Sequence, residues 1–197
     1  FDDGIPSITA DGKTLIFTSR RPDTKGSGID PNTGLYYDDI YMATWNSEKN
    51  AWNPAEGVEG ELNSTGHDAC MSISPDGNII YVYRNIIKET GSGDIYYSTK
   101  KADGRWSSPK TIGKPINSTF FESSACLSPD GNTLYFVSER NGGYGNADIW
   151  KSTKIGKNQW SKPVNLGNII NTEEDELSVF IHPDGKTLFF SSKGHNT

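Results

Sequence analysis

The sequence predicts an all-β protein built from repeated four-stranded antiparallel sheets. Short apolar segments alternate with turn residues, and no apolar pattern with a 3.6-residue period extends beyond one helical turn. Several residue markers also recur at one fixed spacing. They include Trp52, Trp106 and Trp160, and the Asp-Gly pairs that begin at Asp76, Asp130 and Asp184. A fixed internal spacing, here of about 54 residues, is the signature of a repeat architecture.

Further markers keep the same phase. The asparagines Asn63, Asn117 and Asn171 have the spacing of the tryptophans, and so do the acidic residues Asp68, Glu122 and Glu176. Asp-Ile pairs begin at Asp39, Asp94 and Asp148, and only the first of their two intervals is longer, by a single position. The chain is therefore a tandem array of one structural unit.

One repeat can be divided into strands. Strands are expected over residues 124–127, 133–137, 148–152 and 159–163. The Ser128-Pro129-Asp130-Gly131 segment is a turn, because proline presets φ at its second position and glycine tolerates a left-handed exit. Pro163 suits only an outer edge strand, since proline lacks a ladder donor.

Four strands per repeat with a proline in the outermost one describe a blade of a β-propeller. The chain is then one partial propeller domain of about three and a half blades, over residues 1–67, 68–121, 122–175 and 176–197. Because propellers close with about 4–8 blades, we expect further blades from the same polypeptide or from another chain. A tandem of separate small sheets is the structural alternative.

Strand alternation predicts which side chains are buried between blades. The expected core residues on the first and second strands are Ile8, Ile73, Leu127, Ile181, Phe17, Val82, Phe136 and Phe190. Cys70 and Cys126 lie in the first strand of successive repeats, two positions out of phase. We expect both to be buried free thiols, and the alternative is a disulfide, which would have to join neighbouring blades.

Composition excludes several classes of function. The formal net charge is −6 and the basic residues are scattered, which argues against a nucleic-acid partner. No apolar run approaches the length of a membrane span. This chain also shows no signal peptide, because no basic segment followed by an apolar one begins it.

Two sets of motifs resemble known families. Ser74-Pro75-Asp76-Gly77 followed by Asp94-Ile95-Tyr96, and the same pattern from Ser128 to Trp150, resemble the WD40-like PD40 repeat of the TolB propeller over almost the whole chain. Residues 166–172, 175–176 and 190–195 resemble the propeller segment of OmpA-family proteins from Bacteroidota-type bacteria. Some of those proteins, the PorE type, belong to the type IX secretion apparatus.

The resemblance implies a non-enzymatic protein-interaction scaffold of the bacterial cell envelope, in the periplasm or on the periplasmic face of the outer membrane. Its partners would be other envelope proteins, with peptidoglycan bound through a domain not in this chain. A propeller enzyme acting on glycans is the alternative. An enzyme should show one deep, polar, non-repeating pocket, whereas a scaffold should show a flat or shallow face.

No catalytic residue, metal site or cofactor is predicted. His67, His182 and His195 occupy three different phases of the repeat, and no Gly-x-Ser-x-Gly motif is present. The acids Asp68, Glu122 and Glu176 start the innermost strands near the mouth of the central channel. They form either a cation-binding ring or structural ties between blades, and we favour the ties because a repeated residue usually serves the repeat.

A docking surface is expected where the repeat is broken. The first repeat carries an insertion of about ten residues within the loop between its second and third strands, which covers residues 22–38, and a lengthened loop on a rigid scaffold favours binding. Tyr36 and Tyr37 lie in it, and aromatic side chains are common at interfaces. The same end of the propeller should carry His67, Phe120, Phe121 and Tyr144. The alternative is a solvated loop whose tyrosines cover the side of the first blade.

Overall fold

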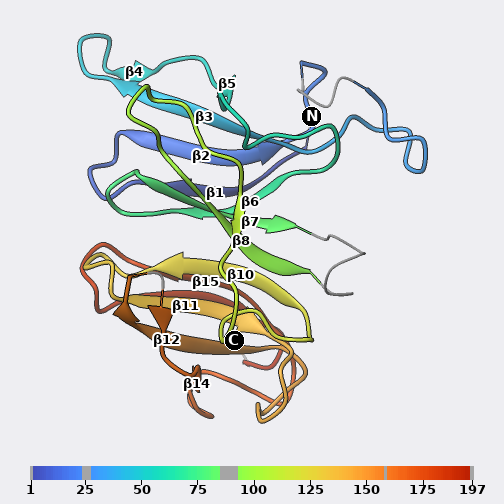
Figure 1. The fold of residues 1–197 in the computed structure, drawn as a ribbon, viewed down its shortest axis with the longest axis vertical. Helices are drawn as coiled ribbons and strands as arrows, with labels where there is room; N and C mark the ends of the chain where they lie inside the picture. Colours follow the sequence, from blue (N-terminus) through green and yellow to red (C-terminus); the bar gives the residue numbers. More distant parts are fainter. Residues whose placement is uncertain (1, 24–27, 85–92, 158, 196–197) are drawn as a thin grey trace. The chain divides into compact units, whose positions relative to one another are not determined.

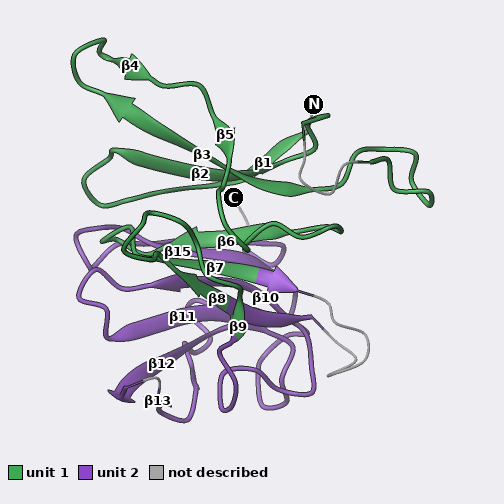
Figure 2. Ribbon diagram, turned by 45° about the horizontal axis from the view of Figure 1, so that its top comes forward, with its two compact units in different colours: residues 1–82, 97–110 green, residues 83–96, 111–197 purple. Residues whose placement is uncertain are grey.

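A computed structural model describes residues 2–23, 28–84, 93–157 and 159–195 (Figure 1). These residues form strands, turns and loops, which confirms the all-β fold class. No helix in the described ranges is long and apolar enough to cross a membrane. The chain divides into two compact units, residues 1–82 with 97–110 and residues 83–96 with 111–197 (Figure 2).

The first sheet lies in unit 1 and shows the expected blade topology. Its antiparallel strands are β1 (Asp3–Ile8), β2 (Thr14–Ser19), β3 (Asp39–Asn46), β4 (Ala51–Trp52) and β5 (Glu56–Gly57). The order is β1-β2-β3-β4, and β5 also pairs with β3. The predicted fourth strand is thus two short strands on either side of Pro54, which cannot donate to the ladder.

The later repeats follow the same plan. The second sheet has the order β6 (Ala69–Ile73), β7 (Ile79–Arg84), β8 (Asp94–Thr99) and β9 (Lys110–Thr111). The third contains β10 (Glu122–Leu127), β11 (Thr133–Ser138), β12 (Asp148–Gly156), β13 (Gln159–Trp160) and β14 (Val164–Asn165), with β13 and β14 both paired to β12. The strands β15 (Glu176–Ile181) and β16 (Leu188–Ser192) form a two-stranded sheet.

The Ser-Pro-Asp-Gly turns are held by their own side chains. The Ser128 hydroxyl donates to Asp130 at 2.5 Å and accepts the N–H of Thr133 at 2.8 Å. Gly131 has φ 72°, a left-handed conformation that glycine adopts without steric cost. Ser74 and Asp76 repeat the same contacts. The motif therefore fixes the connection between the first two strands of a repeat.

The core prediction is confirmed for four of the eight residues. Ile73, Val82, Phe136 and Ile181 are buried, and Leu127, Phe17 and Phe190 are half-buried. Ile8 was expected in the core, but it is 37% exposed. Ser7 and Ile8 lie on opposite faces of β1, and it is Ser7 that faces β6, where its hydroxyl accepts the N–H of Ile73 at 3.1 Å. Both cysteines are buried and free, as predicted.

Candidate functional site

The repeated acids are buried and surrounded by hydrogen-bond donors. In unit 2, Glu122 is fully buried and accepts the N–H of Ser118 at 3.1 Å and the hydroxyls of Ser118 and Ser138 at 2.6 and 2.7 Å. Glu176 has the equivalent contacts, with Thr172 and Ser192 as donors. Each carboxylate thus closes the turn that leads into its own strand.

Asp68, in unit 1, is the third member of this set. It is 2% exposed and accepts the N–H of Ser64 at 2.5 Å. Among the described residues, no group of three or more His, Cys, Asp or Glu side chains could hold a metal ion. The local contacts of all three acids are those of turn-closing residues.

The described part of the inserted loop is a small hairpin. Ile29 and Tyr36 form an antiparallel bridge around a turn in which Asp30 accepts the N–H of Asn32 and the hydroxyl of Thr33, at 2.9 and 3.0 Å. The bond from the Asn32 amide is the main reason that the pKa of Asp30 lies below its usual value. Residues 24–27 of the insertion lie outside the described residues.

His67 ties this hairpin to the linker before β6. Its Nδ1 lies 2.8 Å from Asp38, and its Nε2 lies 3.5 Å from Asp30. The Tyr37 ring meets the imidazole edge-to-face with centroids 4.9 Å apart. Arg20 holds Asp38 from the other side through two bonds of 2.8 and 3.2 Å, which raise the pKa of Arg20. The structure therefore brings Tyr37 and His67 together, as two of the predicted docking residues.

Two apolar side chains project from this hairpin. Ile29 is 54% exposed and Leu35 is 47% exposed, whereas Tyr36 and Tyr37 are half-buried. The sequence interpretation singled out the tyrosines and missed the two aliphatic residues, which belong to no repeated motif. The exposed surface of the hairpin therefore carries two aliphatic side chains beside the polar turn residues Asn32 and Thr33.

The other predicted docking residues belong to unit 2. Phe120 and Tyr144 are 37% and 53% exposed. Phe121 is half-buried, and its ring lies 5.6 Å from that of Tyr83, which the sequence interpretation did not include. The N–H of Tyr144 donates to buried Asp148 at 2.8 Å, so this acid fixes the loop before β12. Burial raises the pKa of Asp148.

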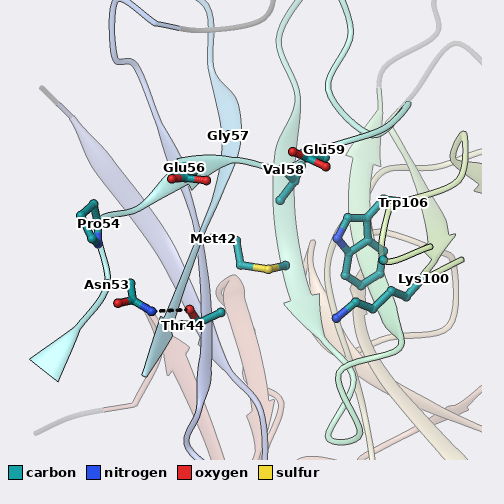
Figure 3. Close-up of a pocket in the computed structure, with 11 residues that line it drawn as sticks. Met42, Thr44, Asn53, Pro54, Glu56, Gly57, Val58, Glu59, Lys100 and Trp106 are labelled. Atoms are coloured by element: carbon teal, nitrogen blue, oxygen red, sulfur yellow. Dashed lines mark hydrogen bonds between the residues drawn. The ribbon is translucent and has the colours of Figure 1, made fainter. Parts of the chain in front are cut away.

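Unit 1 also contains a cavity of about 510 Å³ beside β5, which the sequence did not predict. Met42, Val58 and Trp106 form its apolar centre, and Figure 3 shows Met42 and Trp106 facing each other across it. Glu56 and Glu59 lie on one side of this centre, and Lys100 lies on the opposite side (Figure 3). Asn53 donates to the Thr44 hydroxyl at 3.0 Å at a third edge. Its size is that of a small-molecule or peptide pocket, about 300–1,000 Å³.

A second cavity of about 480 Å³ shares Gly57, Val58 and Glu59 with the first. Asp23 and Arg105 add one charge of each sign to its lining. We call the two cavities together the β5 groove. Both its apolar and its charged side chains come from unit 1.

Comparison with known proteins identifies the fold. No family model and no curated protein sequence matches the chain. TolB from Acinetobacter baumannii is similar in structure, with 16% sequence identity and a TM-score of 0.54 over 99% of this chain and 39% of that one. A putative TolB from Agrobacterium tumefaciens has 17% identity and a TM-score of 0.51, over 98% of this chain and 70% of that one.

Enzymes occur among the similar structures as well. A structure from a study of two prolyl endopeptidases has 14% identity and a TM-score of 0.55, over 96% of this chain and 23% of that one. At these identities the likeness concerns the fold. The chain therefore has the fold of TolB-like β-propeller blades, four-stranded and antiparallel.

Proposed function

We propose that this chain is a non-enzymatic protein-interaction scaffold of the bacterial cell envelope, located in the periplasm or on the periplasmic face of the outer membrane. The hairpin of residues 28–37 is its docking element. The TolB-like fold supports the envelope assignment, together with the resemblance of residues 166–172 and 190–195 to OmpA-family propeller segments. Type IX secretion is the more specific assembly that this resemblance favours, with peptidoglycan bound by another domain.

The single observation that carries the proposal is the way the hairpin is held. The Arg20–Asp38 ion pair and the contacts of the His67 ring with Asp30 and Asp38 fix its base, while Ile29 and Leu35 remain about half exposed at its surface. A fixed loop loses little conformational entropy on binding, so its apolar contacts can contribute directly to affinity. Both ring nitrogens of His67 face carboxylates. This arrangement orders the loop, and it leaves neither nitrogen directed at a side chain that could act as a catalytic nucleophile.

A co-purification experiment tests the proposal. The Tyr36→Ala/Tyr37→Ala double variant and an Ile29→Ser/Leu35→Ser double variant of the full-length protein are used to recover partners from cross-linked envelope fractions. Each should weaken partner binding by about 2 kcal/mol or more, because aromatic and aliphatic anchors dominate interfaces. Phe189→Ala, an exposed site in unit 2, is the control. Undiminished recovery by both folded double variants would move the docking site elsewhere.

A further inference from the structure

The β5 groove combines an apolar centre with three charged side chains, Glu56, Glu59 and Lys100, that form no ion pair among the described residues. In the part of the chain that the structure describes, no ion pair forms with Glu56, Glu59 or Lys100. Arg105, in contrast, is held by Asp103 through two bonds of 2.9 and 2.8 Å. The bonds to Asp103 are the largest cause of the raised pKa of Arg105, and the negative charge of Glu59 contributes less. The carboxylates of Glu56 and Glu59 are therefore available to a cation from outside.

The repeat shows that the fold does not require these carboxylates. Glu56 in β5 corresponds to Lys110 in β9 and to Val164 in β14, the matching short strands of the next repeats. Glu59 corresponds to Gly113 and Gly167 in the same way. The apolar partner Trp106, in contrast, recurs as Trp160. The first repeat thus differs from the later ones by two acidic residues that lie beside a recurring tryptophan. A ligand site is expected to break the symmetry of a repeat in this way.

We propose that the β5 groove binds a lysine or arginine side chain presented by an extended segment of a partner protein. The methylene stem of such a side chain would lie along Met42 and over the outer edges of Val58 and Trp106, which are 6% and 2% exposed, because long basic side chains bury their stems against apolar surface. Its charged head would meet Glu56 and Glu59, and hydrogen bonds between ionised groups are stronger than those between neutral ones.

The dimensions and the second charge of the groove indicate a peptide rather than a free amine. The two cavities share Gly57, Val58 and Glu59 in their linings, and each has a volume larger than that of one side chain, so an extended segment has room to place its backbone along Gly57 and Val58. Lys100 lies across the pocket from both carboxylates (Figure 3), where its ammonium can donate to a carbonyl oxygen of that backbone. This site is separate from the hairpin, and either can be correct without the other.

Fluorescence anisotropy of the full-length protein tests the proposal. The probe is a fluorescein-labelled, capped heptapeptide with two lysines flanking a leucine, and the comparison peptide has norleucine in place of both lysines. The lysine peptide should bind at least about tenfold more tightly, because its charged groups meet unpaired carboxylates. Displacement by chitotetraose together with equal binding of the two peptides would assign the groove to a glycan and overturn the proposal.

The repeat provides variants that should fold. Glu56→Lys and Glu59→Gly each introduce the residue that the second repeat carries, so we expect unchanged melting temperatures. Glu56→Lys should weaken the binding of the lysine peptide by about tenfold or more. Glu48→Lys makes the same charge change at an exposed turn of unit 1 and should alter the affinity by less than about twofold. If Glu56→Lys and Glu48→Lys bind the lysine peptide with equal affinity, the assignment is refuted. The hairpin variants should bind this peptide as tightly as the wild type.

Discussion

The side chain of Asn171 pairs with both backbone polar groups of Ile149. Its Oδ1 accepts the Ile149 N–H at 2.8 Å, and its Nδ2 donates to the Ile149 carbonyl at 3.0 Å. Asn117 makes the same pair of bonds with Ile95, as Asn63 does with Ile40. The asparagine that recurs with the repeat thus substitutes for a neighbouring strand at the start of the third strand of each of these blades.

Replacing this asparagine should destabilise unit 2. Asn171→Asp keeps the shape but places a carboxylate against the Ile149 carbonyl, at a position that is 1% exposed. We expect a loss of about 2–3 kcal/mol in the free energy of unfolding, since a buried donor is lost and an acceptor is left unpaired. Urea denaturation measures it, with exposed Asn168→Asp as the control. Equal stabilities of the two variants would contradict the role given to this side chain.

The Phe136 side chain offers a test of core packing. It is fully buried in β11, opposite Trp150 of β12, and the Arg140 guanidinium lies 4.9 Å from its ring. Phe136→Ala should cost about 3–5 kcal/mol, because burial is lost and a cavity remains. Phe189→Ala, at a ring that is 55% exposed, should cost far less. Chemical denaturation of both variants decides the matter, and a small effect at Phe136 would show that the core collapses around the gap.

The strands could be predicted because their boundaries are marked by local chemistry. In the Ser128–Gly131 turn, the Ser128 hydroxyl bonds to Asp130 and to the N–H of Thr133, so contacts within five residues fix the start of the second strand. The exposure of Ile8 could not be predicted in that way. Which face of β1 is buried depends on the contact between Ser7 and Ile73, residues far apart in sequence.

The candidate sites were only partly predictable for the same reason. The insertion identified Tyr36 and Tyr37, because a break in the repeat is visible in the sequence. The contacts of His67 with Asp30 and Asp38 span 37 and 29 residues and follow no motif. The β5 groove was missed, although a signal existed: Glu56 and Glu59 stand where the next repeat has Lys110 and Gly113.

Arg140 should be a major source of stability in unit 2. Its side chain is 12% exposed, lies 3.3 Å from Glu122 and donates to the carbonyls of Pro115 and Ile116. Burial lowers the pKa of Arg140, and the charge of Glu122 opposes that shift. Arg140→Met should cost about 3–5 kcal/mol, because it leaves a buried carboxylate without its cation.

Two further variants separate the causes of that loss. Arg140→Lys keeps the charge but not the planar fork, so it should recover only part of the stability. Arg105→Met removes an exposed guanidinium from its pair with Asp103 and should leave the unfolding midpoint unchanged. If Arg140→Met lowers the stability no more than Arg105→Met does, the stabilising role assigned to Arg140 is wrong.

The two buried thiols should make the protein sensitive to alkaline pH. Burial raises the pKa of Cys70 to about 11 and that of Cys126 to about 12, from a usual value of 9.0. Below pH 9 both thiols are protonated whether the chain is folded or not, so their burial contributes fully to stability. Above pH 9 the unfolded chain releases these protons while the folded chain retains them, so the free energy of unfolding falls as the pH rises towards 11.

The Cys126→Ala variant isolates this effect. It should be less stable than the wild type at pH 8, through the cavity it creates. The difference between the two proteins should shrink as the pH rises from 9 to 11, because the variant has no thiol at this position to ionise on unfolding. Urea denaturation across that range measures it, and alkylation by iodoacetamide at pH 8 should be slow until the protein is unfolded. A difference that stays constant with pH, or rapid alkylation of the native protein, would show that Cys126 is not held protonated by burial.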